Sequence, residues 1–323
     1  MSEPMPSPGP ARVGFLASRV RAEEKLLLEA YAARGADLVR LDDRAFGLRL
    51  DRPDERPAPH GLGGLDVLHD RSVAFGTAVH LLEVAAARGV RCVNEPEVVR
   101  VCGDKLRTSV ALERAGVPQP ETRVAFSRDE ALRLLDEELG YPAVVKPTVG
   151  SWGRLVARLN DRDAAEAVLE DRELLGNWIH RSIYLQGLVR KPDRDLRVFV
   201  VGDEPIAAIF RHSEHWVTNT ARGATTSDCR LDTREGEAFA DLALAAARAV
   251  GGGILAVDLV EDPEHGPLVL EVNHGMEFRN SIAPTGVDIP GAMADHVLAV
   301  AERARGEREA AAHGEPSLAE VLP

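Results

Sequence analysis

The sequence predicts an α/β protein, because segments with the periodicity of strands alternate with segments with the periodicity of helices from Val13 onward. The chain has 323 residues, of which 45% are hydrophobic, and that is enough for two or three domains with sizeable cores. Stretches rich in Pro, Gly or charge, at 51–60 and 116–120, interrupt the pattern and mark exposed connections.

A first domain is predicted over residues 12–96. Residues 1–11 are rich in Pro and Ser and lack a basic start followed by an apolar stretch, so we expect a disordered lead rather than a signal peptide. Short apolar runs then alternate with two helical segments, which favours an open parallel α/β domain. The expected strands are 13–17, 38–41, 65–69 and 90–93, and the expected helices are 22–33 and 73–88.

A second domain is predicted over residues 97–182. Asp104 can cap a helix that runs to Ala115, and Ser127 with Glu130 forms a capping box that opens a helix to Leu139. Then follow a strand over 143–146, the loop 147–154, a strand over 156–158 and a short helix from Asp161.

A third domain is predicted over residues 183–303, followed by a tail over 304–323. Gly202 and Asp203 form a turn signal between two apolar runs, which predicts a β-hairpin. Thr233 caps a helix that stops at three glycines after Val250. The expected strands are 183–186, 196–201, 205–210, 254–260 and 267–271.

The last two strands carry a candidate metal site. Asp258 lies in one of them and Glu271 ends the other, while strand alternation puts Asn273 on the same face as Glu271. A turn between the strands would bring Asp258 opposite that pair. Two carboxylates and an amide oxygen suit Mg²⁺ or Mn²⁺ rather than zinc. The alternative is a hairpin whose polar residues face water.

The loop over 147–154 is a candidate phosphate site. Gly150, Ser151, Trp152 and Gly153 lie between two strands, and glycines let backbone N–H groups approach phosphate oxygens closely. Lys146 ends the preceding strand, and Lys105 lies in the first turn of its helix, so both could supply positive charge. The alternative is an ordinary glycine hairpin, since no Gly-Lys-Ser/Thr follows.

Several arginines form a candidate anion site. Asp195 and Arg197 share a strand face, Arg211 ends the neighbouring strand, and Asn219 and Arg222 lie in a polar loop. The planar guanidinium binds phosphate and carboxylate through two oxygens. The alternative is a salt bridge from Asp195 to Arg211 or Arg197.

A polar cluster follows the candidate metal strand and could hold a small polar substrate. It includes His274, Glu277 and Asn280. A lone histidine such as His274 is more often a hydrogen-bonded structural residue than a base.

Composition excludes several classes of function. The net charge of −13 argues against a general nucleic-acid binder, and no apolar run is long enough to span a membrane. Three scattered cysteines favour reduced thiols and a cytoplasmic location. The segment 190–230 is nonetheless rich in arginine, which suggests a small anionic ligand or an acidic partner.

These motifs together resemble the ATP-grasp ligases of the RimK/LysX type. The resemblance covers residues from Val13 to about Ala301 and implies an ATP-grasp fold behind an N-terminal pre-ATP-grasp domain. The motifs that carry it are Gly103-Asp-Lys105, Val144-Val-Lys-Pro147, Gly150–Arg154, Asp195-Leu-Arg197, His215–Gly223, Val257-Asp258, Glu271-Val-Asn-His274 and Thr285–Pro290.

The resemblance implies specific roles for these residues. ATP would bind between the central and C-terminal lobes, with Lys105 and Lys146 on its phosphates and the 150–154 loop closed over them. The nucleotide-binding set would also include Gln186, Gly187, Leu188, Val189 and Asp195. Magnesium would be held by Asp258, Glu271 and Asn273. The γ-phosphate would pass to a carboxylate, and an amine would attack the acylphosphate, with the catalytic arginines being Arg197, Arg211 and Arg222. The amino-acid site would use Asn219, His274, Glu277, Asn280 and Thr285.

The resemblance also implies partners. The acceptor would be the C-terminal glutamate of an acidic, LysW-like amino-group carrier protein, and the amine would be 2-aminoadipate, glutamate or a related amino acid. A homodimer or homotetramer is expected. Gly187 stands where the family usually has a glutamate at the adenine hinge; ATP binding is expected to survive this departure, with a weaker nucleotide affinity as its cost. Gly275 in place of a threonine and Ala283-Pro284 in place of a His-Thr pair flank the expected amino-acid pocket, so these departures leave the amino acid open.

Two other functions remain as alternatives. One is a RimK-like ligase that adds glutamate to another protein or peptide, and the other is a catalytically silent nucleotide-binding regulator. A dinucleotide-dependent oxidoreductase is disfavoured, because no Gly-x-Gly-x-x-Gly follows the first strand.

Overall fold

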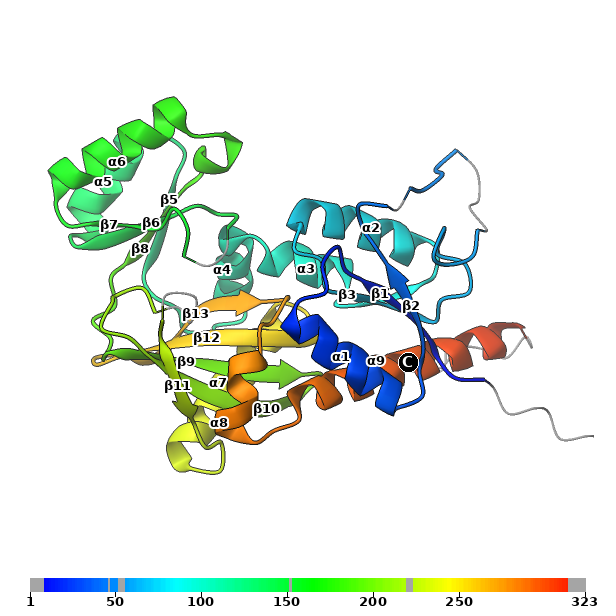
Figure 1. The fold of residues 1–323 in the computed structure, drawn as a ribbon. Coiled ribbons are helices and arrows are strands. Elements are labelled where there is room, and N and C mark those ends of the chain that lie inside the picture. The colour runs from blue at the N-terminus through cyan, green and yellow to red at the C-terminus, as the bar shows by residue number, and fades with distance from the viewer. Residues whose placement is uncertain (1–8, 46, 52–55, 151–152, 219–222, 313–323) are drawn as a thin grey trace, which may run out of the picture. The chain divides into compact units, whose positions relative to one another are not determined.

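The computed structural model describes residues 9–45, 47–51, 56–150, 153–218 and 223–312. These residues form two compact units (Figure 1). Unit 1 contains the chain up to Pro96 together with the segment from Asp288, and unit 2 contains Glu97–Val287. The predicted boundaries between the central and C-terminal domains stay predictions.

Unit 1 is built on a four-stranded parallel sheet in the order β2-β1-β3-β4, as the sequence predicted. Its C-terminal helix α9 packs along α1 and the sheet, and Arg34 of α1 pairs with Asp295 of α9 through two hydrogen bonds. The elements are β1 Arg12–Leu16, α1 Ala22–Ala33, β2 Asp37–Leu41, β3 Val67–Asp70, α2 Phe75–Ala87, β4 Arg91–Val93 and α9 Ile289–Ala312.

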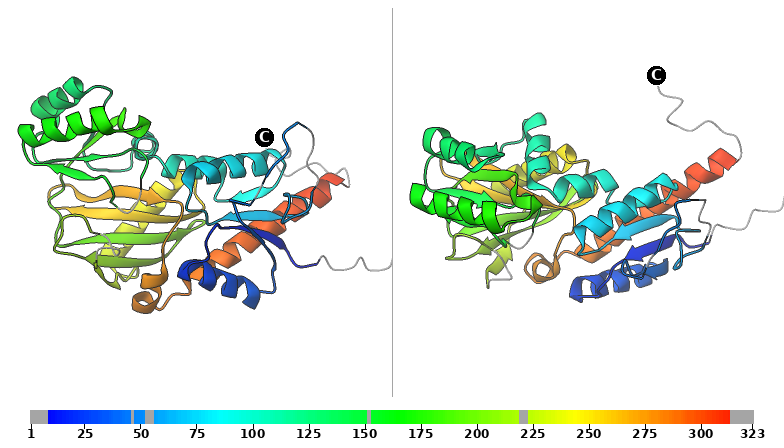
Figure 2. Two further views of the ribbon diagram at one scale, coloured as in Figure 1. Left: turned by 45° about the horizontal axis from the view of Figure 1, so that its top comes forward. Right: turned by 90° about the horizontal axis from the view of Figure 1, so that it is seen from above.

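Unit 2 contains a four-stranded antiparallel sheet in the order β5-β8-β6-β7. Helices α5 and α6 cover one face of it, where residues such as Val145, Leu159 and Leu185 form a core (Figures 1 and 2). The elements around this sheet are α3 Pro96–Cys102, α4 Lys105–Arg114, β5 Thr122–Ala125, α5 Arg128–Leu134, the π-helix η1 Leu135–Leu139, β6 Ala143–Lys146, β7 Ala157–Leu159, α6 Arg162–Leu175, the 3-10 helix η2 Trp178–His180 and β8 Ile183–Gly187.

Unit 2 also contains a five-stranded antiparallel sheet in the order β11-β10-β9-β12-β13. The predicted hairpin at Gly202 is present, because β9 and β10 pair on either side of it. The elements are β9 Arg194–Val201, β10 Glu204–His212, β11 Thr225–Asp228, α7 Arg234–Ala249, β12 Ile254–Asp262, β13 Gly266–Asn273 and α8 Arg279–Thr285.

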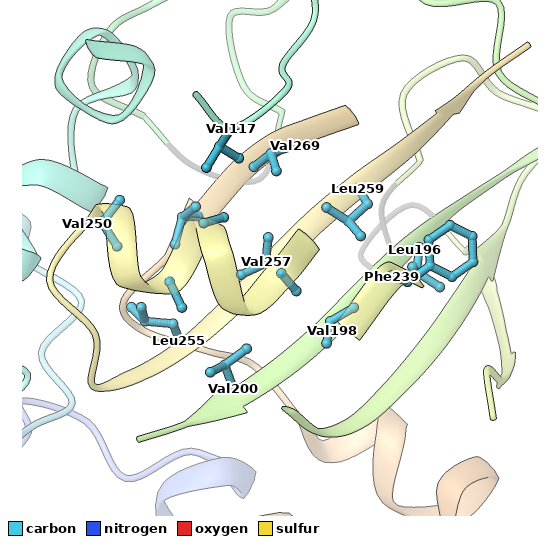
Figure 3. Packing of buried hydrophobic residues seen from close by; sticks show 14 of the residues in the cluster. Val117, Leu196, Val198, Val200, Phe239, Val250, Leu255, Val257, Leu259 and Val269 are labelled. Atoms are coloured by element: carbon cyan, nitrogen blue, oxygen red, sulfur yellow. The ribbon is translucent and has the colours of Figure 1, made fainter. Parts of the chain in front are cut away.

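Helix α7 covers one face of the five-stranded sheet. Thr233 caps it, since its hydroxyl accepts a hydrogen bond of 3.0 Å from the backbone N–H of Gly236. Alternate residues of β9 and β12 pack beneath it and are fully or almost fully buried (Figure 3): Leu196, Val198, Val200, Leu255, Val257 and Leu259. Because side chains alternate along a strand, the residues between them face the other side of the sheet.

Two general features of the described residues follow from the burial pattern. All three cysteines are free and buried, as expected of structural thiols. No helix among these residues combines the length and apolar character that crossing a bilayer requires.

We predict that Leu255→Ala destabilises unit 2 by about 2–5 kcal/mol, because it leaves a cavity under α7. Urea unfolding followed by circular dichroism measures this. Leu174→Ala is the matched control, since Leu174 is 72% exposed on α6, and it should change stability by less than about 0.5 kcal/mol. Equal effects of the two substitutions would contradict the assigned core.

Candidate active site

A row of charged side chains crosses the face of the five-stranded sheet that α7 leaves uncovered. Arg211 on β10 lies opposite Asp195 on β9, and Arg197, two residues further along β9, lies opposite Asp258 on β12. Asp258 in turn lies opposite Glu271 on β13, as the sequence predicted. Strand pairing therefore brings together residues that are up to 76 positions apart in the chain.

The two arginines are held by the two aspartates. Arg197 binds Asp258 through two hydrogen bonds, Nε to Oδ1 at 2.7 Å and Nη2 to Oδ2 at 2.8 Å. Arg211 donates from Nε to Oδ1 of Asp195 at 2.6 Å, and its Nη2 lies 3.3 Å from Oδ2 of Asp258. The Asp195–Arg211 salt bridge, predicted from the sequence as the alternative to an anion site, is therefore present. Arg197 pairs with Asp258 instead of Asp195.

Burial and the neighbouring charges act in opposite directions on the two aspartates. Burial disfavours the charged form of Asp258, but the guanidinium groups of Arg197 and Arg211 outweigh it and hold the pKa of Asp258 below its ordinary value. Burial raises the pKa of Asp195, and Arg211 compensates only in part. Of the two aspartates, Asp258 is therefore the one whose surroundings favour the ionised form.

Glu271 and Asn273 extend the row toward solvent. The side chain of Glu271 is 30% exposed, compared with 7% for Asp258. Lys105, on α4, lies 3.1 Å from Oε1 of Glu271, and Nδ2 of Asn273 lies 3.5 Å from Oδ2 of Asp258. The three predicted metal ligands thus share one face of the hairpin formed by β12 and β13.

The donor set fits a hard divalent cation that is bound together with a polyanion. All three candidate donors are oxygens, counting the amide oxygen of Asn273. No group of three or more His, Cys, Asp and Glu side chains suited to a metal occurs in the part of the chain that the structure describes. Four cationic side chains (Lys105, Lys146, Arg197, Arg211) outweigh three anionic ones (Asp195, Asp258, Glu271), so phosphates would complete the charge balance and the ligand set.

Lys146 is a half-buried cation of the site. Its Nζ donates a hydrogen bond of 2.6 Å to Oε1 of Gln186. Burial lowers the pKa of Lys146 to about 8, and nearby Lys105 acts in the same direction, while Glu271 opposes the shift. The lysine therefore titrates close to physiological pH.

The candidate phosphate loop is tied to helix α4. The backbone N–H of Lys105 donates to the carbonyl of Thr148 at 2.8 Å, and its Nζ donates to the carbonyl of Gly150 at 2.7 Å. Gly153 has φ +63°, and a Cβ there would lie 3.0 Å from Cγ1 of Val217. A glycine is required at this contact between two loops. Ser151 and Trp152 lie outside the described residues.

Four residues were expected to hold adenine. Gln186 is buried, whereas Gly187, Leu188 and Val189 are half-buried. The N–H of Gly187 is already engaged, since it donates to the carbonyl of Glu121 at 2.8 Å.

The predicted substrate residues are only partly placed. Asn219 and Arg222 lie outside the described residues. His274 and Glu277 are half-buried and Asn280 is exposed. The carbonyl of Asn280 accepts a hydrogen bond from Thr226 at 3.1 Å, and the hydroxyl of Thr285 donates to the carbonyl of Ser281 within α8.

Sequence reasoning gave no individual role to two residues near the site, although Lys191 belongs to the basic segment 190–230. Lys191 is half-buried, and its Nζ donates to the hydroxyl of Thr218 and to the carbonyl of Arg194. It thereby anchors the loop that leads to Asn219. Tyr184, which lies near Gln186, was also missed, because a buried tyrosine in an apolar strand gives no signal of its own.

Comparisons with known proteins match almost the whole chain. Residues 13–101 match the LysX preATP-grasp domain, and residues 102–297 match the RimK-like ATP-grasp domain. An alpha-aminoadipate–LysW ligase, LysX, of Sulfurisphaera tokodaii is 34% identical over 84% of this chain and 92% of the relative. A glutamate–LysW ligase, ArgX, of the same organism is 30% identical over 88% of this chain and 98% of the relative. The crystal structure of a RimK domain ATP-grasp protein from Sphaerobacter thermophilus has a TM-score of 0.71 and 31% identity, and covers 89% of this chain and 100% of that one.

If Lys146 binds the phosphates of ATP, we predict that the affinity for ATP falls as pH rises above about 8, because bound phosphate would favour the ammonium form of Lys146. The dissociation constant should rise by up to about tenfold per pH unit between pH 8.5 and 9.5. Calorimetric titration with ATP and Mg²⁺ from pH 7.5 to 9.5 measures this. Lys146→Arg should flatten the dependence, since arginine stays charged. An equally steep dependence in both proteins would assign the titration to another group.

Proposed function

This chain belongs to the RimK-like ATP-grasp family, and we propose that it is an ADP-forming ligase acting on a LysW-like amino-group carrier protein. It would form an amide between the C-terminal glutamate of the carrier and the amino group of 2-aminoadipate, glutamate or a related amino acid. The observation that carries the proposal is the row of paired arginines and carboxylates on the five-stranded sheet. Lys105 contacts Glu271 at the end of this row, and Lys146 precedes the glycine-containing loop. Relatives named as LysW ligases support the choice of acceptor.

The phosphate end of ATP would be bound by charge. The ammonium of Lys105 contacts Glu271 and donates to the carbonyl of Gly150, so it is already in place. Lys146 would supply the second positive charge. Mg²⁺, held by Asp258, Glu271 and Asn273, would neutralise phosphate charge and orient the γ-phosphate when bound.

The arginines would stabilise the charge that develops during transfer. Arg197 and Arg211 are locked by buried carboxylates, so they need no reorganisation when the γ-phosphate passes to the carrier carboxylate. The transfer breaks the bond between the β–γ bridging oxygen and the γ-phosphorus, which releases ADP and leaves an acylphosphate. The amine then attacks the acyl carbon, inorganic phosphate leaves, and the amine loses a proton as the amide forms. We include Arg222 in this set on the basis of the resemblance alone.

The amino acid would bind beside the polar residues that follow β13. We assign His274, Glu277, Asn280 and Thr285 to this region, together with Asn219. Gly275 is exposed, and a Cβ there would meet nothing within 4 Å, so a threonine-sized side chain would fit the position where the family commonly has one. The glycine therefore leaves room for a larger or modified amino acid.

The acidic carrier would meet an otherwise acidic enzyme, whose net charge is −13. The arginine- and lysine-containing segment 190–230 is the part suited to receive it. A cytoplasmic location and assembly into a dimer or tetramer are parts of the same proposal.

The direct test is ADP release by the purified protein with ATP, Mg²⁺, a LysW-type carrier and a panel of amino acids. Turnover with one amino acid, and a matching mass gain on the carrier, would establish the reaction and its substrate. ATP binding without turnover on any carrier–amino-acid pair would instead favour another acceptor or a silent regulator.

We predict that Glu271→Ala lowers turnover at least about a hundredfold, because it removes a cation ligand and the partner of Lys105. Steady-state ADP release measures this. Glu264→Ala is the matched control, since Glu264 is exposed in the turn of the same hairpin and should leave turnover unchanged. Wild-type activity in Glu271→Ala would refute the metal assignment.

A further inference from the structure

The face of the four-stranded sheet that α5 and α6 leave uncovered carries a series of hydrogen-bonded polar side chains. Lys146 on β6 lies opposite Tyr184 on β8, and Thr122 on β5 lies opposite Gln186 on β8. Tyr184 and Gln186 are two residues apart, so they share a face, while Leu185 between them packs into the core with α5 and α6. Gln186 and Tyr184 are both 2% exposed.

Gln186 has one available orientation in this network. The ammonium of Lys146 has only donors, so the amide oxygen of Gln186 must face it, at 2.6 Å. The amide nitrogen then faces two hydroxyl oxygens, that of Thr122 at 3.3 Å and that of Tyr184 at 3.4 Å. Thr122 directs its own hydrogen to the carbonyl of Pro120 at 2.8 Å, which leaves its oxygen free to accept.

The network continues to helix α4. The hydroxyl of Tyr184 lies 2.8 Å from Oγ of Ser109. Ser109 is four residues after Lys105, so both project from the same side of the helix. The hydrogen bonds therefore run from one candidate phosphate lysine to the helix that carries the other.

We propose that Gln186 is a positioning residue for Lys146 and does not read the adenine ring. This role of Gln186 rests on the proposed function, in which Lys146 binds the phosphates of ATP. To reach a base edge, Gln186 would have to release a buried ammonium and two hydroxyl groups, which is unfavourable. A neutral amide is also the group that holds the lysine without cancelling its charge, whereas a carboxylate would compete with phosphate for it.

The test is a double-mutant cycle on nucleotide affinity, measured by calorimetry with ATP and Mg²⁺ and requiring no acceptor. Gln186→Met conserves volume and removes the hydrogen bonds, and it should weaken ATP binding about tenfold. In the Lys146→Met background, the same substitution should have no further effect, because Gln186 acts through Lys146. Gln186→Glu should also weaken binding about tenfold, although it keeps the contact.

The matched control is Gln119→Met. Gln119 lies in the same unit and donates to the carbonyl of Ser109 at 2.9 Å, and among the described residues no hydrogen bond joins it to Lys146. Its substitution should leave ATP affinity unchanged. Tyr184→Phe is a second variant that keeps the proposal testable if Gln186→Met does not fold, and it should weaken ATP binding about threefold only when Lys146 is present.

Three results would overturn the proposal. Additive effects of Gln186→Met and Lys146→Met would mean that Gln186 acts independently of the lysine. A loss of ATP binding with GTP binding unchanged would make Gln186 an adenine reader. A lower melting temperature at wild-type ATP affinity would make its role structural. If the wild-type protein itself bound no ATP, the proposed function would fail together with this inference.

Discussion

The bidentate pair between Arg197 and Asp258 is the interaction on which the site depends. Both residues lie on the inner strands of the five-stranded sheet, and the register of β9 with β12 places them directly opposite each other. Removing one partner of such a buried pair costs about 3–5 kcal/mol, because the other charge is left uncompensated. Arg211 pairs with both Asp195 and Asp258, so the loss of one charged partner would leave another charge of the row uncompensated. Helix α7 makes this arrangement possible by taking the apolar residues of the same strands onto the other face.

The charges of the site are organised for a ligand that is itself highly charged. The deepest part holds arginines that are already neutralised, whereas the lysines near the glycine loop are not fully balanced. The ammonium of Lys146 contacts the neutral amide of Gln186, and the ammonium of Lys105 contacts one carboxylate oxygen of Glu271. The positive charge of the arginines is thus held rigidly by carboxylates, whereas that of the lysines is less compensated. Such a gradient of charge would let one acidic protein hold both a cation and a polyanion at one place.

Much of this could be predicted from the sequence, because it depends on strand alternation and on short turns. The parallel sheet, the hairpin at Gly202 and the opposition of Asp258 and Glu271 follow from local patterns. The partner of Arg197 could not be predicted, since it depends on the register between β9 and β12, whose first residues are 60 positions apart in the chain. The return of α9 to the first unit was likewise not evident, because an amphipathic helix does not specify which surface it covers. The interaction of Gln186 with Lys146 required the pairing of β6 with β8.

The placement of α8 separates the backbone contact that ties it to the charged row from the side chains that it presents. Thr226 lies opposite Arg211 and donates to the carbonyl of Asn280, so the backbone of α8 is tied to the edge of the charged row. Ala283 and Pro284 lie further along this seven-residue helix. Substitutions there change side chains but not the carbonyl that makes the tie. The helix can therefore vary in the groups it offers to a substrate while the arginines and carboxylates stay in register. Under the proposed function, a difference in amino-acid specificity would need no change in the residues of the charged row.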